Sequence, residues 1–150
     1  MSSNYIITGG RNCGKTYTAL ALIETLSEVE GFVSIANEAK NCYFLQSIAT
    51  EEKRKVLWEG TNEPRIGRFT YDQTVFDWAN QYLMTVDAKT ILIDEIGRLE
   101  LLGGGFAPAL EKLAQDSTVT LYLCVRDCFV REVATKFKLA NYTVLSGNTL

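Results

Sequence analysis

The stretch Gly9-Gly10-Arg11-Asn12-Cys13-Gly14-Lys15-Thr16 fits the phosphate-loop pattern G-x-x-x-x-G-K-[S/T]. Loops of this kind bind phosphate through inward-facing backbone amides, and Gly9 and Gly14 permit the backbone angles that such a loop requires. An apolar run at residues 5–8 precedes the loop, and an apolar pattern at helical spacing follows it. The motif needs a strand before it and a helix after it, so the stretch predicts a nucleotide-binding α/β domain.

The residues of this loop have distinct expected roles. Lys15 reaches the β- and γ-phosphates and is a candidate catalytic residue, and the Thr16 hydroxyl is a candidate Mg²⁺ ligand. Tyr17 either lies near the base or, as the favoured alternative, packs on the first helix. Arg11 either leans over the phosphates or faces solvent. The residues of this segment expected to bind a nucleoside triphosphate, whose phosphates face the positive end of the following helix, are Gly9, Gly10, Arg11, Asn12, Cys13, Gly14, Lys15, Thr16 and Tyr17.

A second half of the site is expected after the apolar run at residues 90–93, which is typical of a parallel strand buried on both faces. Asp94 follows this run. In phosphate-loop proteins, the acidic residue that holds Mg²⁺ also stands directly after such a strand. Glu95 comes next. In a regular strand the two side chains point to opposite faces, but a bend at the strand end brings both toward the phosphates, where Glu95 polarises the attacking water. The alternatives are a turn residue for Asp94 and a solvated carboxylate for Glu95.

The remaining pattern alternates between strands and helices. We expect Gly31 to close the first helix, and Asp72 and Asp127 to cap two later helices. Expected strands cover residues 5–8, 32–35, 42–48, 65–70, 90–93, 119–125 and 141–145. Expected helices cover residues 14–29, 75–83, 106–113 and 129–137, and residues 49–64 are expected to be mainly a surface connection. The alternation predicts a single α/β domain over residues 1–150, a three-layer sandwich with a parallel sheet between helices.

The composition restricts the function classes. Of the 150 residues, 47% are hydrophobic and 22% are charged, which fits a globular protein. The net charge of −3 argues against a nucleic-acid or anionic-membrane partner, and the absence of histidine excludes imidazole-based catalysis and metal sites. Because the four cysteines form no disulfide-like framework and no signal peptide or membrane-spanning run is visible, we expect a cytoplasmic protein. No protein partner is indicated.

A family resemblance rests on the stretch Ile91-Leu92-Ile93-Asp94-Glu95-Ile96-Gly97-Arg98-Leu99-Glu100-Leu101. It resembles the D-E-I-G-K-M-E-L signature of the small nucleoside-triphosphatases, a family with archaeal and bacterial members and the human cancer-related nucleoside-triphosphatase. The family resembles the RecA-like, additional-strand-catalytic-glutamate branch of P-loop proteins. Arg98 and Leu99 stand where the family has Lys and Met.

The resemblance implies slow, Mg²⁺-dependent hydrolysis of ATP, GTP and other nucleoside triphosphates with little base selectivity. It implies that Lys15 and Thr16 contact phosphate and Mg²⁺, that Asp94 is the Walker B acid, and that Glu95 is the base that activates water. Glu100 matches the signature as well, but no role follows for it.

Two other functions stay open from the sequence. A small nucleoside or nucleotide kinase needs arginines at its acceptor site, and Arg65 and Arg68 keep that reading open although the arginines are scattered along the chain. A nucleotide-dependent switch with very slow turnover fits the same motifs. Arg126 ends the run at residues 119–125, where it either clamps the γ-phosphate or forms a surface salt bridge.

Overall fold

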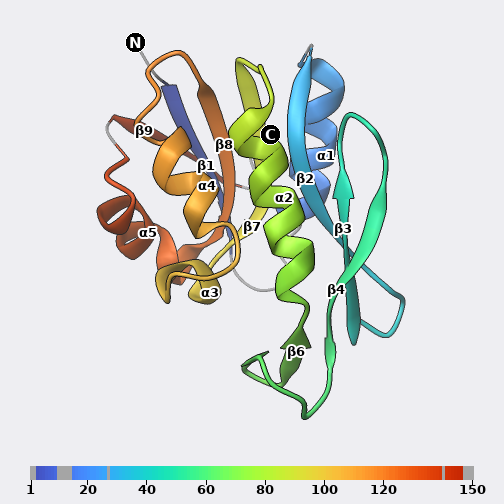
Figure 1. Ribbon diagram of the computed structural model, residues 1–150. Helices are drawn as coiled ribbons and strands as arrows, with labels where there is room; N and C mark the ends of the chain where they lie inside the picture. Colours follow the sequence, from blue (N-terminus) through green and yellow to red (C-terminus); the bar gives the residue numbers. More distant parts are fainter. Residues whose placement is uncertain (1–2, 10–14, 27, 140, 147–150) are drawn as a thin grey trace.

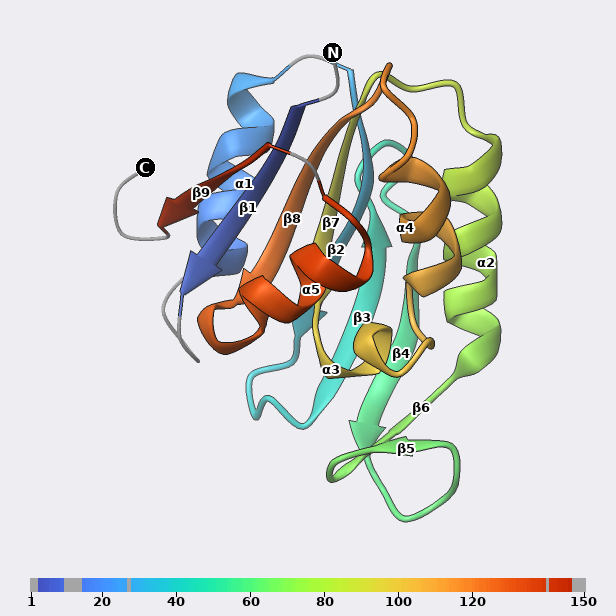
Figure 2. The same cartoon turned by 90° about the vertical axis from the view of Figure 1, so that its left-hand side faces the viewer.

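One mixed sheet organises the protein (Figures 1 and 2). The computed structural model describes residues 3–9, 15–26, 28–139 and 141–146. The parallel half of the sheet consists of β1 (Ser3–Gly9), β2 (Val29–Ala36), β7 (Thr90–Ile96), β8 (Thr120–Arg126) and β9 (Tyr142–Ser146). The antiparallel half consists of β3 (Cys42–Ser47), β4 (Lys53–Glu59), β5 (Arg65–Ile66) and β6 (Phe69–Tyr71). The strand order is β5-β6-β4-β3-β2-β7-β8-β1-β9, so the predicted α/β class is confirmed and carries an antiparallel extension.

Helices cover both faces of the sheet. On one face, α1 (Lys15–Thr25) packs over a small core that includes Ile7, Leu92 and Cys124. On the other face lie α2 (Gln73–Thr85), α4 (Ala107–Leu113) and α5 (Val130–Lys136), around a larger core (Figure 2). The two cores follow from the alternation of strand side chains: Leu92 of β7 faces α1, whereas Ile91 and Ile93 face the larger core. None of the helices in the described ranges is long and apolar enough to cross a bilayer.

The first helix was predicted to be longer than it is. In the structure α1 ends at Thr25, and Val29 is already the first residue of β2. Gly31, which was expected to stop the helix, lies inside β2 with φ of +132°, and a Cβ on it would lie 1.8 Å from the carbonyl oxygen of Leu92 on the neighbouring strand. Glycine is therefore needed there because two strands approach closely, which is the other common reason for a glycine in a strand.

The prediction of a surface connection at residues 49–64 was also wrong in part, because this segment contains β4. This strand begins with the charged run Lys53-Arg54-Lys55, which hides the apolar signal of Val56. The charged side chains lie against aromatic rings: the Arg54 guanidinium carbon is 4.0 Å from the ring centroid of Trp78. The strand expected at residues 65–70 is instead a hairpin, with β5 and β6 on either side of Gly67 and Arg68.

The predicted caps had different outcomes. Asp72 does cap α2, since its carboxylate accepts a hydrogen bond from the Thr74 amide at 3.0 Å. Asp127 is not a cap: it is the first residue of a short 3-10 helix, η1 (Asp127–Phe129), which delays the start of α5 to Val130. A further short helix, α3 (Arg98–Leu101), was not expected. It follows β7 at the sheet edge where the parallel strands end (Figure 2).

Candidate active site

The predicted site residues gather at one edge of the sheet. Because β1, β2, β7 and β8 are parallel, their carboxyl ends meet at this edge, where α/β proteins place their ligands. β1 ends at Gly9 and α1 begins at Lys15, so the expected strand and helix flank the phosphate loop. The residues Gly10, Arg11, Asn12, Cys13 and Gly14 lie outside the described part of the chain. Lys15, Thr16 and Tyr17 form the first turn of α1, and the roles of their side chains stay predictions.

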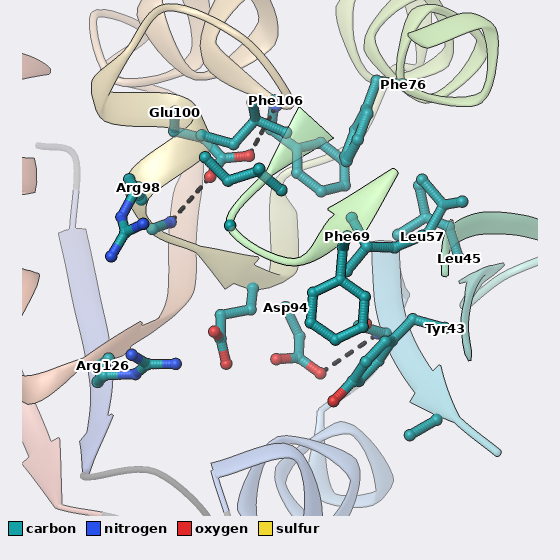
Figure 3. Close-up of a pocket in the computed structure, with 18 of the residues that line it drawn as sticks. Tyr43, Leu45, Leu57, Phe69, Phe76, Asp94, Arg98, Glu100, Phe106 and Arg126 are labelled. Carbon is teal, nitrogen blue, oxygen red and sulfur yellow. Dashed lines mark hydrogen bonds between the residues drawn. The ribbon is translucent and has the colours of Figure 1, made fainter. Parts of the chain in front are cut away.

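Asp94 is held at the end of β7, between the two strands that flank it. Its side chain is fully buried. One carboxylate oxygen, Oδ2, accepts a hydrogen bond from the Ser34 amide of β2 at 3.3 Å. The carboxylate therefore lies at a fixed position, and Figure 3 shows it in the middle of one wall of a cavity.

Glu95 lies at a bulge in β7. Asp94 is opposite Cys124 of β8 and Ile96 is opposite Val125, so Glu95 is the extra residue between two consecutive partners. A bulge changes the direction of the side chains around it. Asp94 and Glu95 consequently both line the same cavity, although alternation in a regular strand would separate them. The two carboxylates thus share one cavity through a bulge inside β7, Glu95 is exposed there, and the roles expected for both at the phosphates stay predictions.

Glu100 has a structural position that the sequence did not reveal. Its carboxylate is 3% exposed and accepts two backbone hydrogen bonds, from Gly97 at 2.8 Å and from Phe106 at 3.0 Å (Figure 3). Burial raises the pKa of Glu100 from 4.5 to about 7, against the lowering effect of these amides. Gly105 packs directly on the carboxylate, since a Cβ there would lie 2.1 Å from Oε2. Glu100 therefore ties together the two ends of the segment between β7 and α4.

Arg126 is the last residue of β8, as predicted. Its Nε atom is buried and has no hydrogen-bond partner among the described residues, and within those residues it forms no salt bridge. Its guanidinium carbon lies 5.9 Å from the ring centroid of Phe129, and the side chain lines the cavity (Figure 3). Arg126 is therefore part of the cavity wall, and its role toward the γ-phosphate stays a prediction.

A cavity of about 1020 Å³ connects these residues. Asp94, Glu95, Arg98 and Arg126 line one side, and aromatic and aliphatic side chains line the other. The larger apolar lining residues are Tyr43, Leu45, Leu57, Phe69, Phe76 and Phe106 (Figure 3). This apolar side has no signal in the sequence, because its residues come from β3, β4, β6, α2 and the start of α4 and share no motif.

Known proteins resemble this chain in sequence and in fold. The nucleoside-triphosphatase THEP1 of Methanopyrus kandleri is 26% identical over 133 residues, which cover 82% of this chain and 73% of that protein. The crystal structure of THEP1 from the hyperthermophile Aquifex aeolicus shares the fold, with a TM-score of 0.74 and 18% identity over 95% of this chain and 88% of that one. A family described as NTPase matches residues 4–148. The family resemblance in the sequence is thus confirmed, and the chain belongs to the NTPase family, whose members hydrolyse nucleoside triphosphates.

Proposed function

We propose that the protein hydrolyses ATP, GTP and other nucleoside triphosphates to the diphosphate and phosphate, with Mg²⁺ bound and with little selectivity for the base. The observation that carries this proposal is the bulge in β7, which presents Asp94 and Glu95 to one cavity at the edge where the phosphate loop begins. Low base selectivity is supported by the motifs themselves, because a phosphate loop and two carboxylates contact the phosphate end and not the base.

The residues present fit a Mg²⁺ ion. Mg²⁺ in nucleotide sites is held by one or two protein ligands together with phosphate oxygens and water. Asp94 offers one carboxylate whose position is fixed by Ser34, and Thr16 stands at the start of α1. In the described ranges no group of three or more acidic or cysteine side chains could hold a metal alone, which fits a site completed by phosphate. When bound there, Mg²⁺ neutralises charge on the β- and γ-phosphate oxygens.

The chain's own residues then have separate tasks. Lys15 binds the β- and γ-phosphates. Glu95 accepts a hydrogen bond from a water molecule and orients it toward the γ-phosphorus, and its exposure to the cavity leaves room for that water. Arg126 faces the same cavity. Its guanidinium group donates hydrogen bonds to the oxygens of the γ-phosphate, on which negative charge develops during the reaction. Removal of one such preorganised donor typically reduces turnover by a factor of ~10² to 10³.

The direct test is release of phosphate from ATP, GTP, CTP and UTP, each with Mg²⁺ and with EDTA. We expect phosphate release from all four triphosphates with Mg²⁺, at similar kcat/KM, and no phosphate release with EDTA. Release from one triphosphate alone would contradict the broad specificity. Tight binding of all four with no phosphate release would instead identify a nucleotide-dependent switch.

A further inference from the structure

The cavity is larger than hydrolysis requires, and we propose that it binds a nucleoside monophosphate as a second ligand, which accepts the γ-phosphoryl group of the bound triphosphate. This inference rests on the proposed function, because it uses the same triphosphate site. Attack by water needs one water molecule beside the γ-phosphate. The half-open cavity of about 1020 Å³ holds the γ-phosphate end at Asp94 and Glu95 and still leaves room for a further small molecule along its apolar side.

The place of the cavity assigns it to the acceptor side. The phosphate loop follows β1, and β8 separates β1 from β7 in the sheet. Adjacent strands lie ~4.8 Å apart, so the ends of β1 and β7 are about 10 Å apart, a span that the proposed triphosphate would bridge with its γ-phosphate at Asp94. The cavity continues from β7 in the same direction, across β2 and β3 to β4 and β6. With the leaving diphosphate on the β1 side and the γ-phosphate beside Asp94, as the proposed function has them, an occupant beyond β7 would lie on the side from which in-line transfer requires attack.

Two aromatic rings form the part of the cavity that suits a planar base. Tyr43 of β3 and Phe69 of β6 lie with their ring centroids 5.7 Å apart and their planes at 80° (Figure 3). Both side chains are half-buried and both line the cavity, with Leu57 beside them. The Arg68 guanidinium carbon lies 5.0 Å from the Phe69 ring centroid at the same wall. Such surfaces bind nucleobases by stacking and tolerate different bases.

An arginine stands where the acceptor phosphate would lie. Arg98, at the start of α3, is exposed and lines the side of the cavity that carries Asp94, away from the aromatic pair (Figure 3). Guanidinium groups bind phosphate through paired hydrogen bonds. A nucleoside monophosphate has a phosphate at one end and a base at the other. Arg98, near the carboxylates, suits the phosphate, and the aromatic rings on the opposite side suit the base. The arginines that look scattered in the sequence, Arg68, Arg98 and Arg126, thus line one cavity.

The transfer step is balanced without a further reactant. An anionic oxygen of the acceptor phosphate forms a bond to the γ-phosphorus. The bond between the γ-phosphorus and the oxygen that bridges it to the β-phosphate breaks, and its electron pair leaves with that oxygen. The products are two nucleoside diphosphates, and no proton has to be transferred.

The test follows the label from ATP carrying a radioactive γ-phosphate, with Mg²⁺ and an excess of AMP, GMP, CMP or UMP as probe. We expect label in the diphosphate of at least one probe. Label in inorganic phosphate with every probe would overturn this inference and leave the proposed hydrolysis intact. Label in a diphosphate without any phosphate release would support the inference and contradict hydrolysis, and label that stays in ATP would contradict both.

Variants at the aromatic rings then test the site itself. Tyr43→Ala and Phe69→Ala should each raise the KM for the acceptor about 5- to 150-fold, which corresponds to the ~1–3 kcal/mol of base stacking. Tyr43→Leu, which retains apolar volume, should have the same effect if the ring matters and protects the test against misfolding. The matched control is Phe44→Ala: Phe44 neighbours Tyr43 in β3 but does not line the cavity, and its ring lies 5.3 Å from the Lys53 ammonium nitrogen.

Two results at these variants would count against the inference. An acceptor KM that Tyr43→Ala and Phe69→Ala leave unchanged would show that the rings bind no acceptor. A rise in the KM for ATP in the absence of any acceptor, of the same size as the rise for the acceptor, would assign the rings to the base of the triphosphate.

Discussion

Replacement of Glu100 tests how the segment between β7 and α4 is held. In the Glu100→Ala variant, the half-buried amide of Gly97 and the buried amide of Phe106 lose their acceptor. An unsatisfied buried amide costs ~1–3 kcal/mol, and a half-buried amide costs less because water reaches it, so we expect the free energy of unfolding to fall by roughly 2–4 kcal/mol. Glu100→Gln keeps the shape of the side chain and one acceptor oxygen, but turns an NH₂ donor toward one of the two amides. Its loss should be about half as large.

The same carboxyl group makes stability depend on pH. Its pKa rises from 4.5 in the unfolded chain to about 7 in the folded protein. Between these values the folded protein holds a proton that the unfolded chain has lost. The stabilisation from this proton is therefore complete below pH 4.5 and is lost as the pH rises through 7, at ~1.4 kcal/mol per pH unit, or about 3 kcal/mol in all. Glu100→Gln cannot titrate and should lose this part of the pH dependence.

The assay is urea denaturation of wild type, both Glu100 variants and Glu132→Gln at several pH values between 4.5 and 8. Glu132 is an exposed glutamate of α5 and serves as the control for loss of one carboxylate. A Glu100→Ala variant within ~0.5 kcal/mol of wild type, the range of ordinary surface substitutions, would refute the role assigned to the two amides. Equal pH slopes for wild type and Glu100→Gln would refute the elevated pKa.

Three further changes have expected outcomes. Gly31→Ala should lower the free energy of unfolding by at least ~3 kcal/mol, because a Cβ would overlap the Leu92 carbonyl and distort two strands; thermal unfolding measures this, and an unchanged midpoint would contradict the close approach. Asn80→Ala should cost ~2–4 kcal/mol, since Asn80 donates to the Gly105 carbonyl and accepts from the Ala109 amide in the core; urea denaturation with the exposed Gln81→Ala as control measures this. Lys15→Ala should lower turnover at least ~100-fold, and full phosphate release by a folded Lys15→Ala variant would falsify the role of this lysine.

The sequence predicted those parts of the fold whose signal is local. The apolar run before Asp94 became a buried strand, and Asp72 capped the helix that follows it. The error at Gly31 arose because glycine can mark a helix end or a close approach of two strands, and only the position of Leu92 distinguishes these causes. β4 was missed because its first three residues are charged, and their packing against rings such as Trp78 appears only in three dimensions.

The candidate site divides in the same way. Asp94 and Glu95 were found because they are consecutive and follow a recognisable strand, and the expected bend between them is present as a bulge. The apolar side of the cavity could not be predicted, because Tyr43 and Phe69 become neighbours only through the pairing of three antiparallel strands. Glu100 matched a motif, but its two backbone partners are set by the turn that leads into α4.

We propose that Glu95 activates the attacking water while Asp94 helps to hold the nucleotide. The measurement is single-turnover hydrolysis together with triphosphate affinity, over a range of Mg²⁺ concentrations, for Glu95→Gln and Asp94→Asn. The exposed Glu111→Gln on α4 is the control. We predict that Glu95→Gln keeps wild-type affinity while hydrolysis falls ~10²- to 10⁴-fold, and that Asp94→Asn requires more Mg²⁺ and turns over more slowly. Hydrolysis by Glu95→Gln at the wild-type rate would show that Glu95 does not activate the water.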